Sequence, residues 1–278
     1  MTDSAAFPRV VACMPAWNAA AFVSPVLESL AAQTYPALSV LISVDACEDG
    51  TAELCEAFAA RHANVRVVRQ PQRLGWVENS NTLLRMADGD FVFFAFHDDP
   101  LGPDYVSKLA AALQRSPGAV LAFSDVDTNQ GRYCYDALDD VCDPYARARH
   151  ILRGDGEWWV PNRGLMRASA AKAAGGLRRH LAGEFSADWP WLLRLALMGE
   201  FVRVPEALLY KNFRPAGLST IWNKGFSRRV GVQLGLLRAI QSSALPPGQK
   251  LRLHAGRIWR GVQEERWRLQ SRLGRAGA

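Results

Sequence analysis

The sequence predicts an α/β protein with a doubly wound, mostly parallel sheet that is flanked by helices and followed by a C-terminal helical extension. Over residues 1–125, short runs rich in β-branched and aromatic side chains alternate with stretches of helical periodicity. This alternation is typical of β-α-β units, in which a helix connects two parallel strands. The run Phe91–Phe96 (FVFFAF) is apolar throughout, as expected of a strand that is buried on both faces of a sheet.

The expected elements follow one another in a regular order. Strands are expected at 9–14, 39–44, 65–69, 91–96 and 120–124, and helices at 26–33, 52–61, 76–86 and 103–115. Pro103 stands at the first position of the last helix, where its fixed φ favours helix initiation. Ligands of such sheets bind at the carboxyl ends of the strands. Functional side chains are therefore expected directly after Met14, Val44, Phe96 and Ser124.

The composition is that of a globular protein. Hydrophobic residues make up 49% of the 278 residues and charged residues 22%, which excludes disordered and fibrous proteins. The five cysteines form no Cys-x-x-Cys pair, so we expect reduced thiols rather than a disulfide framework or a zinc ribbon. Asp3 interrupts the basic start of a signal peptide, and Pro15 and Asn18 interrupt the uncharged segment 10–27. A cytoplasmic protein without a membrane-spanning helix is therefore expected.

The net charge of +6 is distributed unevenly along the chain. Residues 226–278 contain eleven Lys and Arg against Glu264 and Glu265, a balance of +9, so residues 1–225 carry −3. The segment Ala244–Gly248 (ALPPG) divides this basic extension in two. We expect one domain at 1–225 and a helical extension at 226–278.

Acidic side chains follow three of the expected strands. Asp45 follows the second strand, Asp98 and Asp99 follow the fourth, and Asp125 follows the fifth. Because these strand ends meet at one edge of the sheet, the carboxylates could hold a divalent cation such as Mg²⁺ or Mn²⁺. Aspartates are also common in turns and as helix caps, which leaves a structural role open. For Asp98 and Asp99 we favour the functional interpretation, because adjacent carboxylates repel each other without a cation.

Seven sequence segments in a fixed order form a pattern that is known from one enzyme family. They are Pro15–Asn18 (PAWN), Ser29–Pro36 (SLAAQTYP), Val44–Asp45, Gly75 with Asn81, Ala87–Asp99 (ending in FHDD), Gly175–Leu177 (GGL) and Ala187–Asp188. Over roughly residues 8–220, the chain resembles the family 2 inverting glycosyltransferases with the GT-A fold. The resemblance implies a GT-A-type sheet and a division of 1–225 into a nucleotide-sugar half (1–125) and an acceptor half (126–225).

The resemblance also implies a reaction and the residues that perform it. A sugar moves from a nucleotide-diphosphate donor, expected to be a UDP-sugar, to an acceptor hydroxyl with inversion. A divalent metal stabilises the charge on the leaving diphosphate, and a carboxylate accepts the hydroxyl proton. The implied donor-binding residues are Pro15, Trp17, Asn18, Asp45, Asn81, His97 and Arg214. The implied metal residues are Asp98 and Asp99 (for Mn²⁺ or Mg²⁺), the catalytic base is Asp188, and the acceptor segment holds Trp158, Trp159 and Arg163. Trp158 and Trp159 could equally belong to the core.

The sequence departs from the family pattern in four places. The block that begins at Asp45 is one residue short, so the second acid of that block has no clean counterpart. Phe96 replaces the first acid of the D-x-D site, which predicts weaker metal binding. Ala187 stands in place of a Glu and leaves Asp188 alone. Arg214 stands where a His is common and could hold the diphosphate, with an exposed loop arginine as an equal alternative. These departures leave a second hypothesis open, namely an inactive nucleotide-sugar-binding protein or interaction module on the same fold.

The basic extension has two interpretations. Its apolar residues recur at approximately helical spacing with arginines between them: Leu251, Leu253, Ile258, Trp259, Val262, Leu269 and Leu273. Such a helix either packs its apolar side on the body, which we favour, or lies on an anionic membrane, which would suit a lipid-linked acceptor. No recognised nucleic-acid-binding module occurs in the sequence. The expected partners are a nucleotide-sugar donor, a glycan or lipid-linked acceptor and, through the extension, a membrane surface; a homo-oligomer also stays open.

Overall fold

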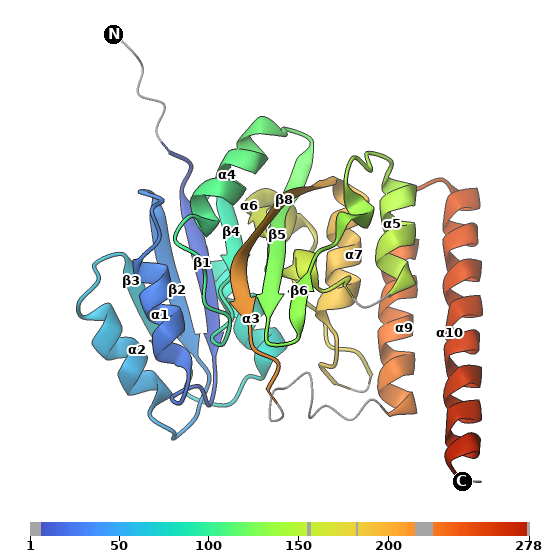
Figure 1. The fold of residues 1–278 in the computed structure, drawn as a ribbon, viewed down its shortest axis with the longest axis horizontal. Coiled ribbons are helices and arrows are strands. Elements are labelled where there is room, and N and C mark those ends of the chain that lie inside the picture. Colours follow the sequence, from blue (N-terminus) through green and yellow to red (C-terminus); the bar gives the residue numbers. More distant parts are fainter. Residues whose placement is uncertain (1–6, 155–156, 182, 215–224, 277–278) are drawn as a thin grey trace.

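The computed structural model describes residues 7–154, 157–181, 183–214 and 225–276, which are organised around one mixed sheet (Figure 1). The strands are β1 (Val10–Ala16), β2 (Leu38–Val44), β3 (Val65–Arg69), β4 (Phe91–Phe94), β5 (Ala119–Thr128), β6 (Gly131–Tyr133), β7 (Leu165–Arg167) and β8 (Glu200–Lys211). The α-helices are α1 (Val23–Ala31), α2 (Thr51–Ala59), α3 (Trp76–Met86), α4 (Tyr105–Arg115), α5 (Pro144–Arg153), α6 (Ala168–Ala173), α7 (Asp188–Met198), α9 (Phe226–Gln241) and α10 (Pro247–Ala276), with 3₁₀ helices η1 (Asp136–Leu138) and η2 (Val160–Arg163). The expected class, a doubly wound α/β sheet flanked by helices, is confirmed.

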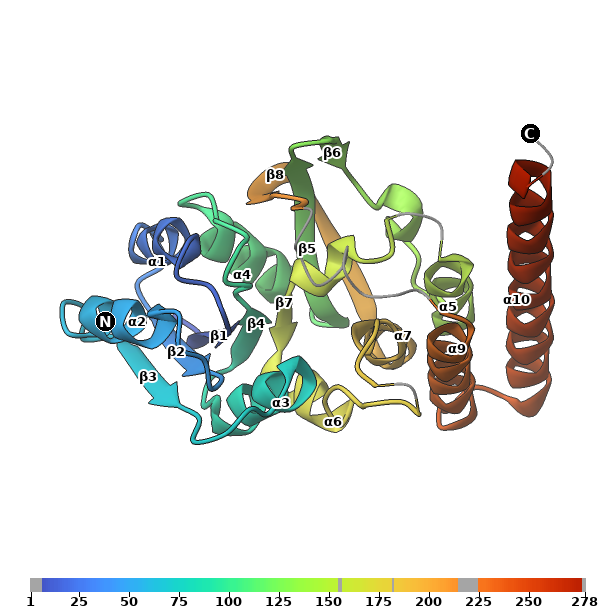
Figure 2. The ribbon, with the colours of Figure 1, turned by 90° about the horizontal axis from the view of Figure 1, so that it is seen from below.

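The parallel part of the sheet positions the site. The strand order is β3-β2-β1-β4-β7-β5-β6, and β1 pairs in parallel with both β2 and β4. Every residue of β1 is buried, because α1 and α4 cover one face of the sheet while α3 and α6 cover the other (Figure 2). Since β1, β2 and β4 run in the same direction, their carboxyl ends meet at one edge, where ligands of such sheets bind.

The sheet changes direction beyond β4. The short strand β7 pairs antiparallel with β4 and with β5, and β8 runs parallel to β5. The strand expected at 120–124 continues to Thr128, so Asp125 lies inside the strand rather than after it. There Asp125 accepts hydrogen bonds from Arg203 at 2.7 and 3.0 Å. The expectation that Asp125 joins the acids at the strand ends is therefore wrong, because a structural ion pair occupies its carboxylate.

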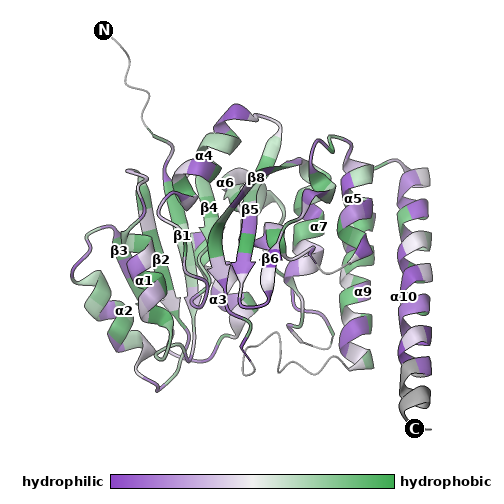
Figure 3. Cartoon of the chain, viewed as in Figure 1, coloured by the Kyte–Doolittle hydropathy of each residue, from purple (hydrophilic) through white to green (hydrophobic). Residues whose placement is uncertain are grey.

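The helices α9 and α10 form the C-terminal extension and lie beside α5 and α7 at one end of the molecule (Figures 1 and 2). Of the apolar residues on α10, Leu253 is buried, whereas Leu251, Ile258, Trp259 and Val262 are more than half exposed. The favoured expectation that α10 packs its apolar side on the body is therefore wrong for these four residues. Figure 3 shows the contrast, because the inner strands are largely hydrophobic while polar and apolar residues alternate along α10.

Polar contacts hold α10 in place. The buried Arg257 donates hydrogen bonds to the carbonyl of Leu152 at 2.9 Å and to Oε1 of Gln233 at 2.5 Å. Arg229 of α9 forms an ion pair with Glu265 of α10 at 2.5 Å. The side chains of Leu269 and Leu273, also expected on this helix, lie outside the described residues. Among the described helices, none combines the length and the apolar character needed to cross a bilayer.

Candidate active site

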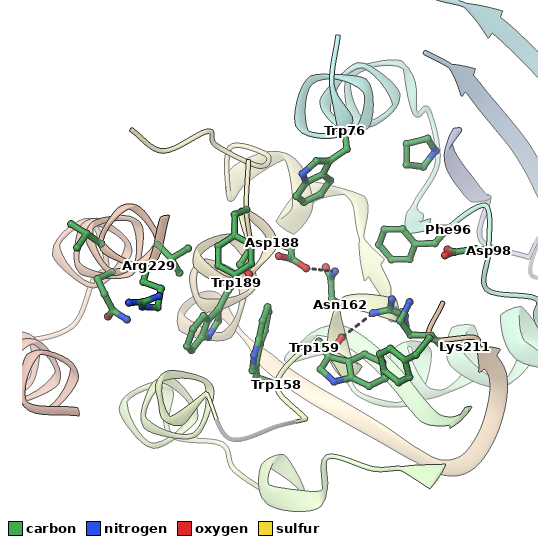
Figure 4. Close-up of a pocket in the computed structure, with 18 of the residues that line it drawn as sticks. Trp76, Phe96, Asp98, Trp158, Trp159, Asn162, Asp188, Trp189, Lys211 and Arg229 are labelled. Carbon is green, nitrogen blue, oxygen red and sulfur yellow. Dashed lines mark hydrogen bonds between the residues drawn. The ribbon is translucent and has the colours of Figure 1, made fainter. Parts of the chain in front are cut away.

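A cavity of about 1280 Å³ opens at the carboxyl ends of β1, β2 and β4. The loops after these strands form one side, and the end of β8, η2 and the start of α7 form the middle. The helices α9 and α10 close the far side. Figure 4 shows this arrangement, with Asp98 and Phe96 on one side, Asp188 and Asn162 in the middle, and Arg229 on the other side.

A buried carboxylate organises the loop before α3. Asp45 is 1% exposed, and its two oxygens accept hydrogen bonds from the backbone N–H groups of Leu74 at 2.7 Å and Gly75 at 2.9 Å. Arg73 adds an ion pair to Asp45 at 3.1 Å, and its guanidinium lies 3.3 Å from the centre of the Trp17 ring. The backbone of Gly75 has φ of +82°, which favours glycine. This network fixes a flat aromatic and cationic surface at the end of the cavity, of the kind on which a nucleobase can stack.

His97 lies between the ends of β1 and β4. Its Nδ1 lies 2.8 Å from the carbonyl oxygen of Pro15, and its ring is 5.5 Å from the ring of Phe22. These contacts hold the imidazole in one orientation while His97 lines the cavity together with Pro15 and the exposed Asn18. The three residues therefore border the same part of the cavity as Trp17 and Asp45.

Asp98 faces the cavity within reach of a guanidinium. Nη2 of Arg214 lies 2.8 Å from Oδ2 of Asp98, and the same guanidinium lies 3.5 Å from the centre of the Phe22 ring. Burial alone would raise the pKa of Asp98, but the positive charges of Lys211, His97 and Arg214 hold that pKa below its ordinary value. Asp98 is therefore ionised at neutral pH and can bind a cation.

Asp99 points in another direction and forms a buried charge cluster. It accepts a hydrogen bond from Nε of Arg163 at 2.7 Å and lies 3.4 Å from Nζ of Lys211. The Arg163 guanidinium stacks between the rings of Phe96 and Trp159, at 4.9 and 4.7 Å from their centres. Burial and the nearby charge of Arg163 lower the pKa of Lys211, while Asp99 opposes that change. The cluster places two cations in the floor of the cavity.

Asp188 is the first residue of α7 and lies in the middle of the cavity. Nδ2 of Asn162 donates a hydrogen bond to Oδ2 of Asp188 at 2.9 Å (Figure 4). Burial raises the pKa of Asp188, and the positive charge of Arg163 limits that increase. A carboxylate with a raised pKa in a cleft is a stronger base than an exposed aspartate, as general base catalysis requires.

Beyond Asp188, the cavity is lined by two stacked indole rings. The rings of Trp158 and Trp189 lie 4.8 Å apart at an angle of 17° (Figure 4). Trp189 is fixed by a hydrogen bond from its Nε1 to the carbonyl of Ile151 at 2.9 Å and by the guanidinium of Arg257 at 5.3 Å. Trp158 and Trp159 are both half-buried and both line the cavity, so they contact the core and the site at once.

The structure brings most of the predicted site residues to this cavity. The residues that line it are Pro15, Trp17, Asn18, Asp45, His97, Asp98, Trp158, Trp159, Arg163, Asp188 and Arg214. Asn81 and Asp99 are not among the lining residues. Asn81 exchanges two hydrogen bonds of 2.9 Å with the backbone of Leu177, so its amide connects α3 to the loop after α6 rather than to a donor. Asp99 is occupied by Arg163 and Lys211, which corrects its assignment as a metal residue.

Three residues that line the cavity are not among those expected from the sequence: Arg73, Asn162 and Lys211. Arg73 lies in the loop after β3, a fourth parallel strand whose carboxyl end reaches the same edge of the sheet, and this position is a signal that the sequence contains. Lys211 is the last residue of β8, another strand end. Asn162 lies on the four-residue η2, and no periodic pattern in the sequence places it beside Asp188.

The residues around Asp98 fit a divalent metal through one carboxylate. Among the described residues, no group of three or more His, Cys, Asp and Glu side chains gathers closely enough to hold a metal alone. Phe96 carries no carboxylate, and Asp99 is buried and does not line the cavity, so Asp98, which lines the cavity beside Arg214, is the carboxylate that remains. A Mg²⁺ or Mn²⁺ ion can be bound by one or two carboxylates when phosphate oxygens and water complete its shell. The donor set is therefore sufficient only together with a bound diphosphate.

The sequence comparisons identify the family to which this fold and cavity belong. The chain belongs to glycosyl transferase family 2, whose sequence profile matches residues 11–159. It is 24% identical over 149 residues to the glycosyltransferase GlyG of Streptococcus pneumoniae, which covers 52% of this chain and 50% of GlyG. It is 27% identical over 229 residues to the uncharacterised protein MT1568 of Mycobacterium tuberculosis, which covers 77% of this chain and 70% of that protein. The chain thus spans about half the length of GlyG.

Solved structures show the same fold. Staphylococcus aureus TarS 1–349 in complex with UDP-GlcNAc superposes with a TM-score of 0.76 at 17% identity, covering 92% of this chain and 73% of TarS 1–349. The mannosyltransferase PcManGT of Pyrobaculum calidifontis, in complex with GDP-Man and Mn²⁺, gives a TM-score of 0.59 at 18% identity. That match covers 93% of this chain and 73% of PcManGT. The expected resemblance to family 2 enzymes with the GT-A fold is confirmed.

Proposed function

We propose that this enzyme transfers a sugar from a nucleotide-diphosphate donor, a UDP-sugar in our hypothesis, to an acceptor hydroxyl with inversion. The observation that carries the proposal is that one cavity contains an ionised acid, Asp98, and a hydrogen-bonded acid with a raised pKa, Asp188. Two carboxylates with pKa values shifted in opposite directions suit two different roles, cation binding and proton transfer.

The donor would occupy the end of the cavity next to β1 and β2. Trp17 with Arg73 provides a stacking surface for the base, and Pro15, Asn18 and His97 border the position of the ribose. The carboxylate of Asp45 already accepts hydrogen bonds from Leu74 and Gly75, so it supports the binding loop as well as bordering the donor.

The diphosphate would lie among Asp98, Lys211 and Arg214. As the glycosidic bond breaks, negative charge grows on the leaving oxygen, and preorganised cations stabilise that charge best. A Mn²⁺ or Mg²⁺ ion at Asp98 would supply Lewis-acid stabilisation of the diphosphate when bound. Lys211 and Arg214 contribute positive charge from the protein itself, which compensates in part for the missing acid at Phe96.

Asp188 would act as the base. With Oδ2 held by Asn162, Oδ1 accepts the proton of the acceptor hydroxyl while the hydroxyl oxygen attacks the anomeric carbon and the bond to the diphosphate breaks. Asn162 is 4% exposed, and its Oδ1 accepts no hydrogen bond from the described residues, so that it can receive one from a second acceptor hydroxyl. Trp158, Trp159 and Arg163 border this acceptor space, and either a glycan or a lipid-linked acceptor satisfies these contacts.

A panel of nucleosides and nucleotides tests the donor assignment. We expect UDP to raise the melting temperature of the enzyme, and to do so more with Mn²⁺ than with EDTA, because the diphosphate completes the metal shell at Asp98. Uridine alone is the control and should have a smaller effect. The absence of a shift with every nucleoside diphosphate, with or without metal, would contradict the proposal.

A further inference from the structure

The cavity is larger than a nucleotide-sugar needs and extends beyond the acceptor residues. Its volume of about 1280 Å³ exceeds the range of roughly 300–1,000 Å³ that is usual for one small ligand. Past the stacked Trp158 and Trp189, its lining passes to α9 and α10. The additional space is therefore a groove between these two helices that is continuous with the position of Asp188.

The groove between α9 and α10 has apolar walls. Phe226 and Val230 of α9 are 66% and 38% exposed, and they stand four residues apart on one face of the helix. Ile258 and Val262 of α10 have the same spacing and are 55% and 52% exposed. All four line the cavity. In a pair of helices that packed on each other for stability, these side chains would be buried against one another.

Polar bridges, rather than these apolar side chains, join the two helices. Arg229 pairs with Glu265, and Arg257 binds Gln233, from one helix to the other. At Gly261 of α10 an added Cβ would lie 4.0 Å from the side chain of Gln233, so the helices are in contact there, while the four apolar side chains stay exposed on the side that lines the cavity. The apolar walls are therefore left open for a ligand.

The charge around the groove indicates the polar part of that ligand. The charged residues that line this side of the cavity are Arg229, Arg257, Glu264, Glu265, Arg266 and Arg268. The two glutamates pair with Arg229, Arg257 and Arg268, so four positive charges against two negative ones leave a balance of +2. Apolar walls between arginines complement a molecule with a hydrocarbon chain and an anionic group. A free glycan would instead be expected to meet hydroxyl-binding and stacking side chains along its whole length.

We propose that the groove between α9 and α10 binds the hydrocarbon chain of a phosphate-bearing lipid, with its phosphate near the arginines of α9 and α10. The sugar or hydroxyl that the lipid carries then lies beside Asp188, with Trp158 and Trp189 between it and the groove. That this lipid is the acceptor rests on the proposed function, whereas the binding of its hydrocarbon chain does not.

Dodecyl phosphate below its micelle concentration is a direct probe, followed by calorimetry. We expect it to bind the enzyme, and the double variant Val230→Ser/Val262→Ser to bind it about 10-fold more weakly, because two methyl-bearing contacts are lost. Inorganic phosphate should bind far more weakly than dodecyl phosphate. Leu54→Ser on the remote α2, where the leucine is 39% exposed, is the matched control and should leave binding unchanged. Equal affinity of the double variant, or no binding by the native protein, would overturn the proposal.

Two further measurements separate the groove from other uses of the same helices. Trp259 is 65% exposed and does not line the cavity, so Trp259→Ser should leave dodecyl phosphate binding unchanged. If vesicles of phosphatidylglycerol bind the protein through Trp259 and not through Val262, α10 lies on a bilayer surface and the groove is not the lipid site. If Val262→Ser instead dissociates a dimer in sedimentation, the groove belongs to a second copy of the chain, and the proposal fails. The UDP-induced rise in melting temperature should persist in Val230→Ser/Val262→Ser, so loss of lipid binding and loss of donor binding are separate results.

Discussion

The end of the cavity to which we assign the donor, called the donor end below, and the far wall formed by α9 and α10 are stabilised by different means. At the donor end, charges are buried and surrounded by aromatic rings, as in the cluster of Asp99, Arg163 and Lys211. At the far wall, the ion pair of Arg229 with Glu265 is partly solvated, and apolar side chains remain exposed. Removing one partner of a buried ion pair destabilises the folded protein strongly, whereas removing one partner of a solvated pair destabilises it little. The donor end is therefore preorganised, and the far wall can adjust to a ligand.

The largest difference between the two regions is expected from removing one arginine in each. Arg163→Ala should lower the free energy of unfolding by about 3 kcal/mol, because it leaves the buried Asp99 with Lys211 alone. Arg229→Ala should lower it by less than about 1 kcal/mol, since Glu265 keeps Arg268 at 2.8 Å. Urea unfolding of both variants gives the two values. Equal losses would show that the contrast between the regions is wrong.

Asn162→Ala tests the preorganisation of the base. Removal of the hydrogen bond from Asn162 to the ionised Asp188 costs about 1.5–3 kcal/mol of stabilisation of the carboxylate, which raises the pKa of Asp188 further. The reaction needs the deprotonated base, so activity is lost as the pH falls through that pKa. The acid limb of the kcat/KM profile should therefore move to higher pH in the variant. Asn64→Ala is the control, because the amide of Asn64 binds the carbonyl of Leu38 far from the site. It should leave the acid limb of the profile unchanged.

Arg73→Ala tests the surface assigned to the base of the donor. The loss of the guanidinium from the Trp17 ring and from Asp45 should weaken UDP binding by about 10-fold, the equivalent of roughly 1.4 kcal/mol. Calorimetric titration with UDP measures this change. Arg85→Ala on the exposed side of α3 is the control. An unchanged affinity for UDP in Arg73→Ala would remove Arg73 from the donor site.

The smallest difference between the two regions is expected from one glycine substitution in each. Gly75→Ala should destabilise the protein by about 1–2 kcal/mol, because φ is +82° and the new Cβ would lie 2.6 Å from the Glu184 carboxylate. Gly248→Ala, in the first turn of α10 with open space around it, should stabilise by up to about 1 kcal/mol. Thermal unfolding distinguishes the two signs. A stabilised Gly75→Ala would show that the loop before α3 is not fixed as described.

The parallel half of the fold was predictable because each strand and helix has its own hydrophobic period, and the carboxyl ends of parallel strands must meet. The same rule located Asp45, His97 and Asp98. It could not separate Asp98 from Asp99, because adjacent residues on a turn point in different directions and only the positions of Arg163 and Lys211 decide between them. The three-residue β7, which separates β4 from β5, is too short to leave a periodic signal.

The prediction for the C-terminal extension was wrong for a different reason. The spacing of Leu251, Ile258 and Val262 correctly indicates that they share one face of a helix, but a period does not say which face turns toward the body. Arg257 decides the question, since its hydrogen bonds to Leu152 and Gln233 turn a polar side inward and leave the apolar residues exposed. Sequence patterns that assume apolar burial cannot anticipate a helix that is held by a buried arginine.

The most direct test of the central claim compares donor binding with turnover in Asp188→Asn. UDP release from a panel of UDP-sugars, with water as a surrogate acceptor, reports turnover, and calorimetry with UDP reports binding. The account predicts that Asp188→Asn binds UDP as tightly as the native enzyme and loses turnover by about 100-fold or more, because the amide cannot accept the proton. Asp88→Asn, at a side chain that is 89% exposed, should match the native enzyme in both measurements. Turnover in Asp188→Asn equal to that of the native enzyme would contradict the account.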